Sequence, residues 1–122
     1  MSTNCKHPLT TLYKTERGVV FRCPGCNRFN VVFGPVILPH DARGFMALKQ
    51  LVETLEPDRN PATHIGKRCY HLQTADGQVG LAFTPDEVEE LRALLAGAAA
   101  MNELDGMLRA TTLGPAAPPA EA

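Results

Sequence analysis

Two cysteines that flank a Pro-Gly turn constrain this chain more than any other feature. In the octapeptide RCPGCNRF, Pro24 and Gly25 separate Cys23 from Cys26. Proline presets one backbone angle and glycine relieves the bend, so both sulfurs can face one point. Asn27 follows at a position where such turns need a left-handed residue, which asparagine tolerates well. The turn supplies half of a tetrahedral thiolate site, and we expect structural zinc as its metal.

The other zinc ligands must come from elsewhere in the chain. A predicted N-terminal hairpin returns Cys5 toward Cys23, which gives a third thiolate. For the fourth ligand, His7 is nearest in sequence, but residues two apart in a strand point to opposite faces. Cys69 begins a later strand, where burial in the core is the ordinary fate of a cysteine without a ligand role. The predicted metal ligands are Cys5, Cys23, Cys26 and His7, with Cys69 as the alternative fourth ligand and water, His40 or His71 as further alternatives.

The first half of the chain predicts strands followed by a helix. A hairpin over residues 9–22 turns at Thr15–Gly18, and further strands are expected over 29–33 and 36–38, the second ended by Pro39. Asp41 is placed to cap a helix that ends before Pro57. Its expected buried stripe is Phe45, Leu48, Leu51, Val52 and Leu55.

The second half repeats this order. Strands are expected near residues 68–74 and 79–83, joined by an Asp-Gly turn. Thr84 and Glu87 form a capping box for a helix that Gly106 is predicted to end. Its expected buried stripe is Val88, Leu91, Leu94, Leu95 and Ala98.

The two halves also align with each other at an offset of 43 positions without a gap, pairing Gly34 with Gly77 and Leu48 with Leu91. The pattern predicts a tandem ββα repeat, although two ββα units can share a pattern through physics alone. The predicted fold class is α+β, an antiparallel sheet with two helices packed on it and a zinc knuckle on the N-terminal hairpin. The predicted organisation is one domain over 1–110, with the hairpin and knuckle at 1–33, ββα units at 29–56 and 68–106, and a disordered Pro/Ala tail at 111–122.

Composition and charge narrow the setting. The net charge of the 122 residues is −1, but residues 1–30 carry five basic residues against Glu16 alone. An excess of basic residues in one segment most often means that they are hydrated on the surface, and a nucleic-acid-binding surface is the alternative. The N-terminus has no apolar signal core and no stretch is long enough to span a membrane. We expect a cytoplasmic protein, where cysteines bind metals or stay as thiols more often than they form disulfides.

Two other kinds of chemistry compete with structural zinc. A Cys-Pro-Gly-Cys turn after a strand suggests thiol–disulfide exchange by Cys23 and Cys26, but the helix that would activate the leading thiol is missing from the pattern. Arg22 and Arg28 flank the turn beside Phe29, which suggests nucleic-acid binding. No oxyanion hole or orienting acid is evident, so no catalytic residues are assigned.

Residues 21–29 resemble the knuckle of zinc-ribbon proteins, in which a strand enters Cys-Pro-x-Cys and a Gly or Asn follows. The resemblance implies metal binding at Cys23 and Cys26. The layout as a whole resembles small uncharacterised bacterial proteins with an N-terminal cysteine, a Cys-x-x-Cys and strand–Gly–strand–helix units. We therefore expect a zinc-binding, non-catalytic interaction or regulatory module that has a protein partner, with nucleic-acid binding and redox chemistry as alternatives and no small-molecule substrate inferred.

Overall fold

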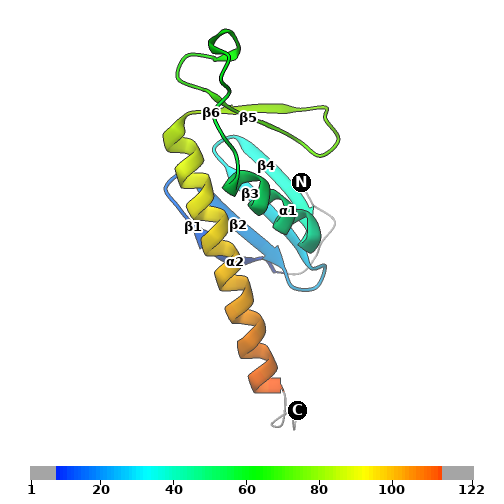
Figure 1. The fold of residues 1–122 in the computed structure, drawn as a ribbon. Coiled ribbons are helices and arrows are strands. Elements are labelled where there is room, and N and C mark those ends of the chain that lie inside the picture. The colour runs from blue at the N-terminus through cyan, green and yellow to red at the C-terminus, as the bar shows by residue number, and fades with distance from the viewer. Residues whose placement is uncertain (1–7, 114–122) are drawn as a thin grey trace.

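The computed structural model describes residues 8–113 and has the predicted α+β class (Figure 1). Four strands come first and are followed by a helix, a short loop helix, a hairpin and a long second helix. The elements are β1 Thr10–Lys14, β2 Gly18–Cys23, β3 Arg28–Phe33, β4 Val36–Asp41, α1 Ala42–Glu53, the 3-10 helix η1 Pro61–Thr63, β5 Tyr70–Gln73, β6 Gly80–Phe83 and α2 Pro85–Leu113.

The strands form two sheets rather than the single sheet expected from the sequence. The first is an antiparallel meander in the order β1-β2-β3-β4, and the second contains only β5 and β6. Both helices lie on one face of the larger sheet, and the C-terminal part of α2 extends beyond it (Figure 1). The β5–β6 hairpin lies across the end of this arrangement instead of extending the sheet. Its strands are four residues long, and pairing inside the hairpin satisfies their facing backbone groups.

The core lies between the larger sheet and the two helices. Phe29 of β3 stacks on Phe45 of α1 with ring centroids 4.7 Å apart, and Phe33 meets Phe83 edge-on at 6.0 Å. The predicted stripe of α2 is buried as expected, but Leu51 of the α1 stripe is 45% exposed. The buried apolar set is Leu12, Val20, Phe29, Val31, Phe33, Phe45, Leu48, Val52, Leu72, Phe83, Val88, Leu91, Leu94, Leu95 and Ala98.

Local capping signals are confirmed at both helices. The Asp41 side chain accepts the Gly44 N–H at 2.7 Å, and Thr84 and Glu87 exchange hydrogen bonds of 2.9 and 3.2 Å between side chain and backbone. Each bond satisfies a backbone donor that a helix start leaves unpaired. Arg92 of α2 reaches the carbonyl oxygens at the end of α1, so the second helix caps the first.

Two predicted boundaries are wrong. Strand β4 continues through Pro39 to Asp41, and α2 continues through Gly106 to Leu113. Pro39 is tolerated because β4 is an edge strand and Pro39 faces Asn30 as a pair that does not exchange hydrogen bonds. Gly106 does not take the left-handed conformation that ends helices, and glycine inside a helix costs only about 1 kcal/mol relative to alanine.

The two predicted repeat units share an order of elements but not a setting. Gly34 and Gly77 both have a positive φ, as their alignment suggests. However, β3 and β4 are six residues long and join a four-stranded sheet, whereas β5 and β6 are four residues long and pair only with each other. Helix α1 has 12 residues and α2 has 29. The two units therefore do not occupy equivalent places, and duplication stays a prediction.

Candidate functional site

The Cys23–Cys26 turn connects β2 to β3 at one end of the larger sheet. The Cys26 N–H donates to the Cys23 Sγ at 3.3 Å, and the Asn27 N–H donates to the Cys23 carbonyl oxygen at 2.7 Å. Asn27 has a φ of 55°, so the predicted left-handed residue after the second cysteine is confirmed. These two hydrogen bonds hold the backbone of the turn around the Cys23 sulfur.

The two sulfurs of the turn differ in their surroundings. Cys23 is 1% exposed, and Cys26 lies on the surface. Cys23 takes part in a disulfide bond, whereas neither Cys26 nor Cys69 does, so the two cysteines of the turn are not bonded to each other. A disulfide sulfur cannot bind zinc, so any zinc site here belongs to the reduced chain.

The structure brings together only part of the predicted ligand set. Cys5 and His7 lie outside the described residues. Cys69 precedes β5, whose Tyr70 pairs with Phe83 near the opposite end of the sheet from Cys23. His71 contacts Asp58 at 3.3 Å instead. Within residues 8–113 no three histidine, cysteine or acidic side chains are grouped to hold a metal ion.

The Cys23–Cys26 turn, called the knuckle from here on, lacks the helix that activates a redox thiol. The six-residue strand β3 begins two residues after Cys26. Thiol–disulfide enzymes lower the pKa of the leading thiol by placing it at a helix N-terminus, whereas the element directly after this turn is strand β3. The local structure therefore matches the expectation that the activating helix is missing.

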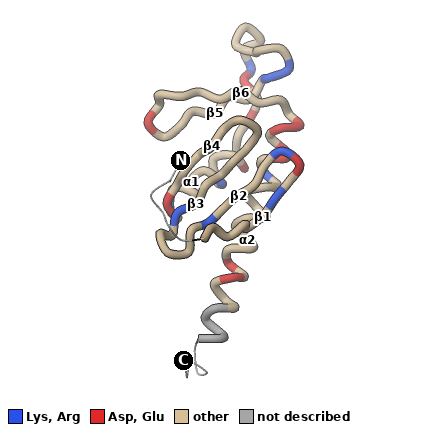
Figure 2. The backbone as a smooth tube through the Cα atoms, turned by 180° about the vertical axis from the view of Figure 1, so that it is seen from behind, with Lys and Arg blue, Asp and Glu red and all other residues tan. Residues whose placement is uncertain are grey.

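The two arginines beside the knuckle point to opposite faces of the sheet. Arg22 pairs with Phe29 on the face covered by helices, and its guanidinium contacts Asp105 of α2 at 3.3 Å. Arg28 is exposed and directly precedes Phe29 in β3. Because neighbouring residues of a strand point to opposite faces, its side chain points away from the helices. In Figure 2 the Lys and Arg segments are spread over several parts of the tube, and Asp and Glu segments lie among them. The arrangement does not join Arg22 and Arg28 in one basic surface.

Ion pairs near the start of α2 hold Arg17 of the N-terminal part and Arg68 of the loop before β5. Arg17 bonds to Glu90 at 2.7 Å through its Nε, and its backbone N–H donates to the same carboxylate. Arg68 bonds to Glu87 at 2.6 Å. Burial raises the pKa of both glutamates, but their hydrogen bonds and the guanidinium groups outweigh it, so both pKa values lie below their usual range.

These carboxylates make stability sensitive to acid. A carboxyl whose pKa is lower in the folded state stabilises the fold above its unfolded pKa of 4.5, and the contribution is lost as pH falls through the folded pKa. We expect the urea midpoint to fall as pH drops below about 4.5, and to fall less steeply in Glu87→Gln. The exposed Glu56→Gln is the matched control and should keep the wild-type pH profile. An unchanged profile in Glu87→Gln would show that Glu87 contributes nothing to the acid sensitivity.

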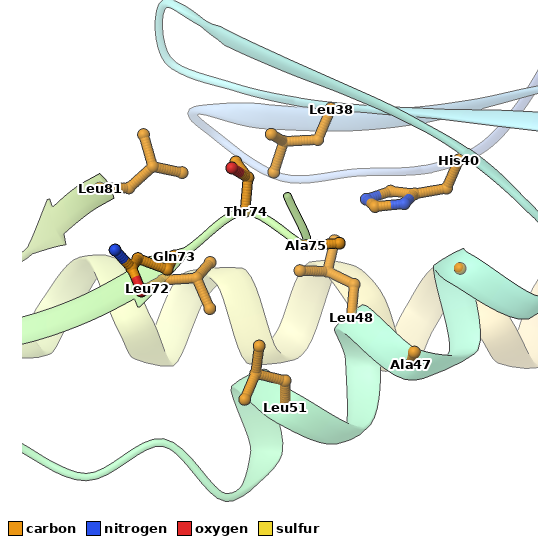
Figure 3. A pocket seen from close by; sticks show the side chains of 11 residues that line it. Leu38, His40, Ala47, Leu48, Leu51, Leu72, Gln73, Thr74, Ala75 and Leu81 are labelled. Atoms are coloured by element: carbon orange, nitrogen blue, oxygen red, sulfur yellow. The ribbon is translucent and has the colours of Figure 1, made fainter. Parts of the chain in front are cut away.

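The sequence did not predict an apolar cavity that the structure contains. It measures about 180 Å³ and lies between β4, α1 and the β5–β6 hairpin. In Figure 3 leucine side chains from these elements point toward one space, and the His40 ring extends toward it from β4. Its leucines are Leu38, Leu48, Leu51, Leu72 and Leu81. The available signal was Leu51, an apolar stripe residue that the two-helix core leaves uncovered.

Comparison with known proteins adds a family but no activity. The model of DUF6686, described as a family of unknown function, matches residues 5–111. The chain belongs to this family. The match includes every strand and α1 and ends within the last turn of α2, so the family extends over almost all of the described fold. No curated protein and no solved structure matches the chain. Over residues 8–113, no helix is long and apolar enough to cross a membrane.

Proposed function

We propose that the reduced chain is a zinc-binding, non-catalytic module that binds a protein partner. Cys23 and Cys26 would hold the metal from the β2–β3 turn, with Cys5 and His7 as the remaining ligands. The observation that carries the proposal is the hydrogen bond from the Cys26 N–H to the Cys23 Sγ, formed in a turn that left-handed Asn27 completes. In the reduced chain, a turn of this shape would let two sulfurs face one ion while the strands on either side keep their pairing.

A metal at this place would act through stability rather than chemistry. The knuckle joins two central strands of the meander, so fixing it fixes the register of β2 against β3. A domain of this size buries a modest core, and the free energy of zinc binding adds to its folding free energy. The disulfide at Cys23 and zinc binding by Cys23 are alternative states of one sulfur, so the experiment starts from fully reduced protein.

The test is elemental analysis of the reduced full-length chain after removal of loosely bound metal. We expect about one zinc per chain in the wild type, as for a single closed structural site. Cys26→Ser should lose most of this zinc and should unfold at a lower temperature, because one of four ligands is gone. Cys69→Ser is the matched control and should keep both the zinc and the unfolding temperature.

Two outcomes would contradict the proposal. Reduced wild-type protein without zinc excludes the site altogether. Equal zinc in Cys26→Ser and in the wild type shows that any metal is held elsewhere.

A further inference from the structure

We infer that the groove between the outer edge of β4 and the β5–β6 hairpin binds an extended peptide segment of a partner protein, which pairs with β4 as an added strand and places an apolar side chain in the leucine cavity. The inference rests on the partner-binding part of the proposed function and not on its metal. It names the partner by its chemistry: an extended segment with an apolar anchor and a nearby basic residue.

The first step is the open edge of β4. The two-residue turn at Gly34 and Pro35 makes Phe33 and Val36 a hydrogen-bonded pair. Hydrogen-bonded and non-hydrogen-bonded pairs then alternate along β3 and β4, so Ile37 and Pro39 belong to non-hydrogen-bonded pairs. The N–H and C=O of Ile37 and the C=O of Pro39 therefore point outward. Across residues 8–113, no strand pairs with this edge. Such a row of backbone groups is what an extended chain recognises.

The second step is the space beside that edge. A groove of about 490 Å³ separates residues 36–40 of β4 from Thr74, Val79 and neighbouring residues of the hairpin. It opens beside the leucine cavity, because Leu38 and Leu81 line both. The cavity of about 180 Å³ is a little larger than an apolar cavity of ~150 Å³ that holds benzene, so one leucine or phenylalanine side chain fits it.

The surroundings of the groove favour a single added strand over a second copy of this chain as its occupant. An added strand lies about 4.8 Å from β4, and a whole partner sheet would continue outward from there. The β5–β6 hairpin stands on the far side of the groove, where those further strands would be (Figure 1). Pro39 also removes one outward donor, which limits pairing of two β4 edges.

Charge indicates what accompanies the apolar anchor. Asp76 is the one acidic residue among those that line the groove, and none of them is Lys or Arg. Its Oδ1 accepts bonds from Thr74 and Gln78, which hold the carboxylate at the tip of the hairpin. A lysine or arginine on the bound segment would lie beside this carboxylate and gain from it.

The probe is a library of random twelve-residue peptides displayed on phage and selected against the full chain. We expect enriched peptides with one apolar anchor and a basic residue. As synthetic peptides, they should lose at least about tenfold in affinity for Leu51→Glu, because that change puts a charge at the cavity. Met46→Glu is the matched control, since Met46 is 51% exposed on the same helix but lines neither space, and it should bind like the wild type.

A second variant separates strand pairing from apolar contact. Ile37→Pro removes an outward N–H but no bond to β3, and it should weaken the same peptides by about 2- to 10-fold. Slower hydrogen exchange of the Ile37 amide in the wild-type complex is the accompanying readout. The inference is overturned if no peptide is enriched, if Leu51→Glu binds as tightly as Met46→Glu, or if the chain instead dimerises through β4. If the reduced wild-type chain holds no zinc but binds the peptides, the metal proposal alone is contradicted. If it holds zinc but binds no peptide, the groove proposal alone is contradicted.

Discussion

Replacing Phe45 by alanine is expected to lower the free energy of unfolding by about 3–5 kcal/mol. Phe45 is 1% exposed, and its ring stacks on Phe29 at 4.7 Å with the planes 11° apart. The change removes the transfer free energy of the ring, leaves a cavity and ends an aromatic contact between α1 and the sheet. Urea unfolding followed by circular dichroism measures the difference.

The control for this prediction is the neighbouring residue. Met46→Ala changes a side chain that is 51% exposed on the same helix, so its effect should stay within about 0.5 kcal/mol. If Phe45→Ala does not fold, Phe45→Leu provides a smaller loss that can still be measured. Equal stability of Phe45→Leu, Met46→Ala and the wild type would mean that α1 does not pack on β3 as described.

Replacing Gly18 by valine is expected to lower the free energy of unfolding by about 1–3 kcal/mol. A Cβ at Gly18 would lie 2.7 Å from a methyl group of Leu94, 3.0 Å from the Phe33 ring and 3.0 Å from the Val32 carbonyl oxygen. The carbonyl oxygen belongs to the ladder between β2 and β3 and cannot move, and Leu94 of α2 is 0% exposed, so neither contact relaxes freely. The added side chain therefore pushes α2 away from the sheet.

Gly80→Val is the matched control for this change. A Cβ at Gly80 meets no atom within 4 Å, and Gly80 also begins a strand. Valine there should leave stability unchanged or raise it by about 0.4–1 kcal/mol, because it restricts the unfolded chain. Thermal unfolding of the two variants side by side decides the matter, and a Gly18→Val protein as stable as Gly80→Val would contradict the described contact of α2 with β2.

Features set by neighbouring residues could be predicted from the sequence. The Asp41 cap, the Thr84–Glu87 capping box and left-handed Asn27 each depend on a few adjacent side chains and backbone groups. The starts of the strands and helices agree with the sequence for the same reason, but α2 continues past the predicted stop at Gly106 to Leu113. Where the prediction failed locally, at Pro39, the deciding fact was that β4 lies at an edge, which depends on the whole sheet.

Features set by distant segments could not be predicted. Periodicity shows which α1 residues share a face, but not that Leu51 stays 45% exposed and lines a cavity with the β5–β6 hairpin. The same holds for Arg17 and Arg22. The sequence places them in a basic N-terminal segment, whereas the structure pairs them with Glu90 and Asp105 of α2. The groove combines β4 with a hairpin more than thirty residues later in the chain, so no local pattern contains it.

The Cys23–Cys26 turn and the groove lie at different places on the larger sheet and have different proposed roles. The knuckle joins β2 to β3 at one end of the meander, and the groove follows its outer strand β4. The proposed metal would hold the strands in register, and the open edge would then offer a fixed row of backbone groups to a partner. A zinc site that stabilises the sheet should therefore also favour peptide binding without contacting the peptide.

X-ray absorption at the zinc edge of the reduced, zinc-loaded protein identifies the atoms that bind the proposed zinc. We expect sulfur neighbours at about 2.3 Å from the zinc, fewer of them in Cys26→Ser and the same number in Cys69→Ser. A first shell of only nitrogen and oxygen at about 2.0–2.2 Å, unchanged in Cys26→Ser, would contradict this expectation.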